Sequence, residues 1–162
     1  MFKKLTNKKI LKNQKGLTLV ELLAVIVILA IISAIAIPSI GNIVENSRYN
    51  AVKADAINVL NAATLYYTDN PEGEATVTNG TGSTTATITV TQLLAAKYLE
   101  TAGKMPDGAS VAIGNPKKLS SNEAINYSGG KTVTFNTATI DLINKDPKKG
   151  STDGNKVIGP TP

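Results

Sequence analysis

An apolar run at residues 17–37 constrains this chain more than any other feature of its sequence. Only Thr18, Glu21 and Ser33 interrupt it with polar side chains. As a helix rising 1.5 Å per residue, the run would be about 31 Å long. That length matches the roughly 30 Å thickness of the hydrocarbon core of a bilayer. The sequence therefore predicts a single helix that can cross a membrane.

The charges are placed asymmetrically around this run. Residues 1–16 contain six lysines and no acidic residue, whereas the rest of the chain carries 11 basic and 12 acidic side chains. Because positive charge is enriched on the cytoplasmic side of spanning helices, the N-terminus is predicted to lie in the cytoplasm. The six lysines of residues 1–16 account for the basic isoelectric point of the chain. The rest of the chain therefore lacks the excess positive charge of a nucleic-acid-binding domain.

Missing residue types narrow the possible chemistry. The chain has no His and no Cys, which excludes Ser–His and Cys–His catalysis, disulfides and thiolate metal sites. It also lacks glycine-rich phosphate-binding motifs. Two acidic groupings lack the regular spacing of a calcium-binding loop; they consist of Asp69, Glu72 and Glu74, and of Asp141, Asp146 and Asp153. We expect no enzyme activity, no cofactor and no bound metal.

A cleaved secretory signal peptide is one alternative interpretation of the N-terminus. The apolar run is longer than the usual 7–15 residues of such a peptide. The tripeptide Ala34-Ile35-Ala36 nevertheless fits the small-residue cleavage pattern, so this alternative stays open.

The start of the apolar run carries a more specific pattern. The segment Lys15-Gly16-Leu17-Thr18-Leu19-Val20-Glu21-Leu22-Leu23 resembles the class III signal sequence of type IV pilins and pseudopilins. The resemblance implies that a prepilin peptidase cuts after Gly16 and methylates the new amino terminus at Leu17. It also implies roles in assembly for Glu21, the fifth residue of the mature chain, and for Pro38, its twenty-second.

Physical chemistry gives these implied roles a reason. In a bundle of helices, the Glu21 carboxylate of one subunit can pair with the Leu17 amine of a neighbour, and buried charges require such partners. Pro38 lacks an amide hydrogen and clashes with the carbonyl of Ala34, which predicts a bend or local melting around residues 32–41.

The helix is predicted to continue beyond the membrane. Residues 42–67 contain neither Pro nor Gly, and Asp69-Asn70-Pro71 forms a stop signal. Apolar side chains recur at helical spacing along one face, namely Val52, Ala56, Val59, Ala63 and Tyr66, with Leu60 and Tyr67 beside them. We expect this face to be covered by the rest of the chain.

The residues after this helix are predicted to form the strands and the short helix that cover its apolar face. Alternating patterns indicate a hairpin over residues 75–78 and 84–90, although this Thr- and Gly-rich stretch fits a flexible surface loop equally well. Further strands are indicated at 110–113, 123–128, 131–136 and 139–143. A short helix is predicted at residues 91–99. Gly129-Gly130 forms the turn of a hairpin whose Ile125, Tyr127, Val133 and Phe135 share one face.

The predicted fold is therefore α+β, with a long N-terminal helix packed against a small antiparallel sheet, the architecture that the resemblance also implies. Five segments follow from this interpretation: a cleaved leader at residues 1–16, a transmembrane and assembly helix at 17–41, an amphipathic continuation at 42–70, a loop and sheet at 71–143, and a flexible tail at 144–162, where Lys, Asp, Gly and Pro dominate.

The resemblance implies a structural role. The expected function is that of a major pilin, anchored in the membrane by one helix and then assembled into a surface filament for adhesion, motility or biofilm formation. The implied partners are other copies of the chain, the prepilin peptidase, an assembly platform, minor pilins and the membrane. A competence pseudopilin, which would add DNA as a partner, a secretion pseudopilin and an uncleaved signal-anchor protein remain alternatives.

Overall fold

The computed structural model describes residues 18–71, 76–78, 84–152 and 154–160, and divides the chain into two compact units, Met1–Pro38 and Ser39–Pro162. We call the second unit the head. Helix α1 (Leu19–Asp69) contributes residues to both units and is helical throughout, Pro38 included. The predicted local melting around residues 32–41 is therefore not found, because α1 is helical on both sides of the proline.

The part of α1 within the head supplies one wall of the core. Its buried residues repeat at helical spacing and include most of the predicted apolar face; they are Tyr49, Val52, Ala56, Val59, Leu60, Ala62, Ala63 and Tyr67. Tyr66 is half-buried at the edge of this face. Burying such a face against a sheet is the main stabilisation available to an amphipathic helix.

The described strands form two small sheets rather than the single sheet that was predicted. The first has the order β1-β2-β3-β4 and is antiparallel. Its strands are β1 (Thr76–Thr78), β2 (Thr84–Thr89), β3 (Ser110–Ala112) and β4 (Lys118–Ser120). The second has the order β5-β6-β7, with β5 (Ile125–Ser128), β6 (Lys131–Phe135) and β7 (Lys156–Ile158). Strands β5 and β6 are antiparallel, whereas β6 and β7 are parallel.

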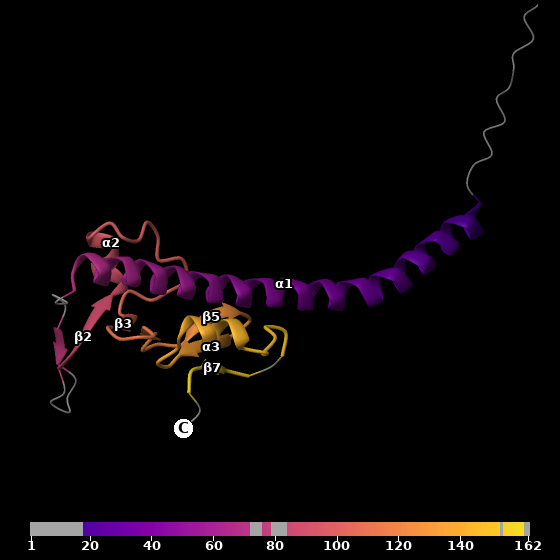
Figure 1. Ribbon diagram of the computed structural model, residues 1–162. Helices are drawn as coiled ribbons and strands as arrows, with labels where there is room; N and C mark the ends of the chain where they lie inside the picture. The colour runs from indigo at the N-terminus through magenta and orange to yellow at the C-terminus, as the bar shows by residue number, and fades with distance from the viewer. Residues whose placement is uncertain (1–17, 72–75, 79–83, 153, 161–162) are drawn as a thin grey trace, which may run out of the picture. The chain divides into compact units, whose positions relative to one another are not determined.

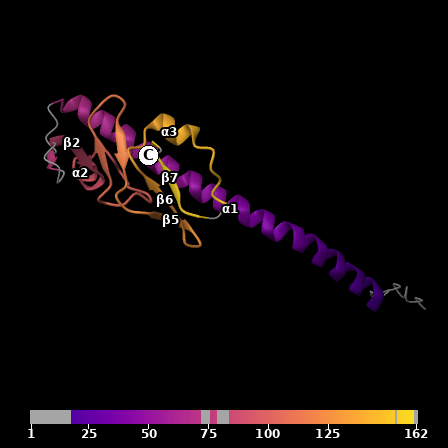
Figure 2. The same ribbon diagram turned by 90° about the horizontal axis from the view of Figure 1, so that it is seen from below.

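Within the head, the two sheets contact different stretches of α1. The ring of Tyr49 lies 5.2 Å from that of Tyr127 on β5, centroid to centroid. The Tyr67 hydroxyl donates a 2.9 Å hydrogen bond to the carbonyl of Val111 on β3. Figures 1 and 2 accordingly show β5 and β7 beside the earlier turns of this stretch of α1, and β2 beside its last turns, where Figure 1 also shows β3.

The β5–β6 hairpin confirms the predicted alternation. Ile125, Tyr127, Val133 and Phe135 are all buried. Gly129 and Gly130 both have positive φ, at 52° and 82°, which glycine adopts without the steric penalty of a side chain. The pairing contains one irregularity between Asn126 and Ser128.

Two predicted elements are wrong in type or position. Residues 139–143 were expected to form a strand, but α3 (Ile140–Lys145) begins there because the Thr139 hydroxyl accepts a hydrogen bond from the Leu142 amide and caps a helix. The short helix predicted at residues 91–99 is α2 (Val90–Ala95), which begins earlier because Thr89 and Gln92 form its capping box.

The predicted flexible tail at residues 144–162 is also corrected by the structure. Strand β7 pairs with β6, and Lys156 and Ile158 are buried. The Asp146 carboxylate accepts a 2.6 Å hydrogen bond from Tyr49 on α1. The segment was predicted to be flexible because charged and turn-forming residues dominate its composition. Pairing with a strand that is distant in the sequence orders it instead.

The head should fold without the apolar part of α1. Every residue of the buried apolar core lies between Tyr49 and Ile158. Deleting residues 1–44 removes the exposed apolar side chains of the first half of α1 and keeps this core intact. We expect a soluble monomer with a cooperative thermal transition in circular dichroism, and a chain without such a transition would contradict the core described here.

Two buried tyrosines should make the head sensitive to alkaline pH. Burial raises the pKa of Tyr67 to about 12 and also raises the pKa of Tyr49, which further donates to Asp146. An unfolded tyrosine has a pKa near 10. The two neutral phenols therefore contribute their full stabilisation below pH 10. This contribution is lost as pH rises toward 12, since the unfolded chain releases the phenol protons at lower pH than the folded chain does.

The expected loss from Tyr67 alone is about 2 kcal/mol of unfolding free energy between pH 8 and pH 12. Melting temperatures of the head measured between pH 8 and pH 12 test this expectation. A Tyr67→Phe variant is the control, because it should show a shallower decline above pH 10. An equally steep decline in the variant would rule out the tyrosine as the cause.

Candidate processing and assembly site

The first turn of α1 is built around Glu21. The Glu21 Oε2 atom accepts hydrogen bonds from the Thr18 amide, at 2.9 Å, and from the Thr18 hydroxyl, at 3.0 Å. The Glu21 amide in turn donates to the Thr18 hydroxyl at 3.2 Å. This reciprocal pair is a capping box, in which two amides at the start of a helix gain partners that the helix itself cannot provide.

The capping box explains why the helix begins where it does. Thr18 occupies the cap position, its carbonyl accepts from the Leu22 amide at 3.1 Å, and α1 starts at Leu19. An acidic residue in the first turn also interacts favourably with the positive end of the helix dipole. Glu21 therefore stabilises the start of the helix through hydrogen bonds, in addition to the charge pairing that the sequence predicted.

Two of the predicted site residues lie outside the described residues. These are Gly16 and Leu17, the residues on either side of the predicted cleavage point. The structure begins one residue later, at Thr18. Glu21 is exposed on the first turn of α1, and Pro38 is an exposed residue inside the same helix.

The helix between these residues is suited to a membrane. By length and composition α1 is able to cross a bilayer. Its large apolar side chains from Leu19 to Ile37 are exposed, each by about half or more of its surface. An uninterrupted apolar surface of this kind would be unfavourable in water, so it requires lipid or other helices around it.

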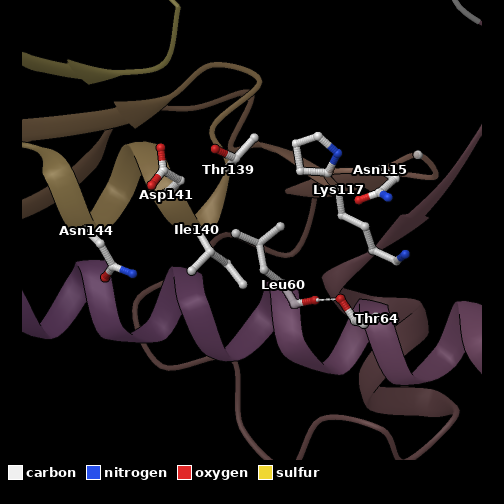
Figure 3. Close-up of a pocket in the computed structure, with 10 residues that line it drawn as sticks. Leu60, Thr64, Asn115, Lys117, Thr139, Ile140, Asp141 and Asn144 are labelled. Atoms are coloured by element: carbon white, nitrogen blue, oxygen red, sulfur yellow. Dashed lines mark hydrogen bonds between the residues drawn. The ribbon is translucent and has the colours of Figure 1, made fainter.

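A cavity in the head is the other place where chemistry could occur. It has a volume of about 830 Å³ and lies between α1, α3 and the loop before β4 (Figure 3). Leu60 and Ile140 provide apolar lining, and the charged lining residues are Lys117 and Asp141. Asp141 forms a 3.0 Å ion pair with Lys145 one turn later, so its charge is already matched.

The lining shows no catalytic arrangement. The Thr64 hydroxyl donates to the Leu60 carbonyl of its own helix at 2.8 Å, which is a local bond of a mid-helix threonine (Figure 3). Asn115 and Asn144 add amide groups to the rim. Among the residues that the structure describes, no group of acidic side chains could hold a metal ion. Of the acidic residues considered earlier, Glu72, Glu74 and Asp153 lie outside the described residues. Asp69 accepts a hydrogen bond from Tyr98, and Asp146 accepts one from Tyr49.

Comparison with known families gives a match to the first half of α1 and to the residues just before it. The family model described as the prokaryotic N-terminal methylation motif matches residues 11–37. The match includes Gly16, Leu17, Thr18 and Glu21 and ends just before Pro38. The resemblance to the class III signal sequence of type IV pilins is thereby confirmed over these residues. Comparison with curated proteins and with solved structures gives no significant match.

Proposed function

We propose that this chain is the precursor of a type IV pilin, a subunit that is held in the membrane by α1 and then assembled into a helical surface filament. The observation that carries this proposal is the N-terminal methylation motif at residues 11–37, placed on a capped apolar helix that continues into the core of an α+β head. A structural subunit needs these features and needs no catalytic site.

Processing is the first step of the proposed function. A prepilin peptidase would cut between Gly16 and Leu17, remove the six-lysine leader and methylate the Leu17 amine. Glycine suits the position before the cut because it allows close approach of an enzyme to the backbone. The capping box at Thr18 and Glu21 would remain in the mature chain, since both residues follow the cut.

Assembly is the second step, and the geometry of Glu21 supports it. Both hydrogen bonds from Thr18 end on Oε2, and no described residue donates to Oε1. The carboxylate could therefore keep its capping bonds and accept a charged amine from a second subunit at the same time. In the apolar interior of a filament, that contact would neutralise both charges and fix the register between neighbouring helices.

We place the chain as a major pilin that serves adhesion, motility or biofilm formation. The charges of the chain beyond the leader nearly cancel, which gives little support to a filament that binds DNA along its length. The test is to shear surface material from cells and identify its proteins by peptide mass. The chain should be the most abundant protein of the fibres, and fibres should be lost when its gene is deleted. Fibres that persist without the chain would contradict the major role.

A further inference from the structure

We propose that residues 145–149, Lys145-Asp146-Pro147-Lys148-Lys149, form a lysine loop that binds the headgroups of anionic phospholipids while the subunit is still held in the membrane. The inference rests on the proposed membrane-anchored precursor, but it does not depend on filament assembly. Its basis is the place at which the head holds this loop against α1.

The lysine loop is fixed to the earliest turns of the head. Gly150, the residue after it, packs so closely on α1 that a Cβ there would lie 2.4 Å from the Glu45 carbonyl oxygen. The Ser151 amide donates to the Asn46 side chain at 2.9 Å. Both contacts are within the head, and together they hold the loop beside residues 45–49.

Buried polar contacts reinforce this attachment. Asp146, whose side chain is 4% exposed, accepts from the Tyr49 hydroxyl at 2.6 Å and lies 3.5 Å from the Lys53 ammonium. The Tyr127 hydroxyl donates to the Gly150 carbonyl at 3.1 Å. The one acidic residue of the lysine loop thus points into the head, and its three lysines are exposed.

Residues 45–49 follow the apolar surface of α1 directly in the chain. Beyond the predicted spanning run, Ile40, Ile43 and Val44 are still 58%, 67% and 41% exposed. The contacts of the loop with Glu45 and Asn46 come directly after these apolar side chains, within the same unit. The lysine loop is therefore attached where the exposed apolar surface of α1 gives way to polar residues.

The exposed side chains of the lysine loop and of the adjoining turn of α1 carry an excess of positive charge. Lys145, Lys148 and Lys149 are joined by the exposed Arg48 on α1. Lys145 pairs with the exposed Asp141, and Lys148 lies 3.8 Å from Asp146 and donates to the Val157 carbonyl. The structure pairs neither Arg48 nor Lys149 with a described carboxylate. Each basic residue near an anionic membrane strengthens binding about fivefold, and the attraction extends only about a Debye length.

The experiment uses the full chain in nanodiscs and single-cysteine reporters, since the sequence contains no Cys. A fluorophore at Asn144→Cys, on an exposed position beside the lysine loop, reports its distance from lipids that carry a nitroxide on the headgroup. Ala95→Cys, exposed on α2, is the matched reporter away from the loop. The discs contain either phosphatidylcholine alone or about one third phosphatidylglycerol.

We expect phosphatidylglycerol to increase quenching at residue 144 severalfold and to leave quenching at residue 95 unchanged. Lys149→Glu should abolish most of this increase, and its side chain makes no described contact that the fold requires. Lys148→Gln with Lys149→Gln should do the same, whereas Lys97→Gln with Lys104→Gln, an equal loss of charge elsewhere, should not. High salt should also remove the increase.

Equal quenching at residue 144 in both lipids, or an increase that survives Lys149→Glu, would overturn the proposal. Quenching that follows the number of chains per disc rather than the lipid would show that the lysine loop binds a second copy of the chain, which also overturns it. Failure of the chain to enter nanodiscs would instead contradict the membrane-anchored precursor itself.

Discussion

A Glu21→Ala variant, expressed as the sole copy of this chain, is expected to produce no surface filaments. In the proposed filament, each mature amino terminus would lie among apolar helices without its carboxylate partner. Removing one member of a buried charge pair costs about 3–5 kcal/mol, and the cost recurs with every added subunit. Insertion into the membrane should persist, because an unfavourable charge near the lipid is gone.

The capping box requires a control that separates charge from helix structure. Glu21→Gln keeps an acceptor at the same position, and Gln also serves in capping boxes, as Gln92 does at α2. If the charge pair drives assembly, both the Ala and the Gln variants should lack filaments. If the cap alone matters, the Gln variant should assemble and Thr18→Val should fail. Normal filaments from Glu21→Ala would contradict the role given to this carboxylate.

The second large effect concerns Gly16. Replacing it with Ile places a branched side chain directly before the proposed cleavage point, where close approach of the peptidase to the backbone is needed. We expect the leader to remain attached, so the chain should accumulate in the membrane at the mass of the precursor and form no filaments. Intact-mass measurement of the membrane fraction checks this result.

A matched control is available in the same leader. Lys12→Gln removes one of six positive charges and leaves the residues around the proposed cut unchanged. It should be processed like the unaltered chain. If the Gly16→Ile variant is also shortened by 16 residues, the role given to Gly16 in cleavage is wrong.

Local patterns were sufficient to predict the parts of the fold that depend on neighbouring residues. The helical spacing of Val52, Ala56, Val59 and Ala63 predicted the buried face of α1, because a helix places such residues on one side. The alternation of Ile125, Tyr127, Val133 and Phe135 around a Gly-Gly turn predicted the β5–β6 hairpin for the equivalent reason in a strand.

Contacts between distant residues could not be predicted in this way. Strand β7 pairs in parallel with β6, and its Lys156 is buried with its ammonium 5.5 Å from the centre of the Tyr127 ring. A lysine surrounded by Gly, Asp and Ser gives no local sign of such a position. The ring contact and two backbone carbonyl acceptors, from Thr152 and Gly154, make its burial possible.

The sequence pattern predicted which residues form the candidate site, and their roles stay predictions, but it predicted only part of their local structure. The residues Gly16, Leu17 and Glu21 were identified by their order after a basic leader, and the family comparison supports that pattern. The capping box was missed although its signal, Thr followed three residues later by Glu, is present in the sequence.

The most direct test of the account is the N-terminus of this chain within purified surface fibres. Fibres sheared from cells, separated from membranes and analysed by intact mass and N-terminal peptides should contain a chain that begins at Leu17 and carries one methyl group. A chain that still begins at Met1, or that is found only in the membrane fraction while fibres consist of other proteins, would contradict the assignment as a processed filament subunit.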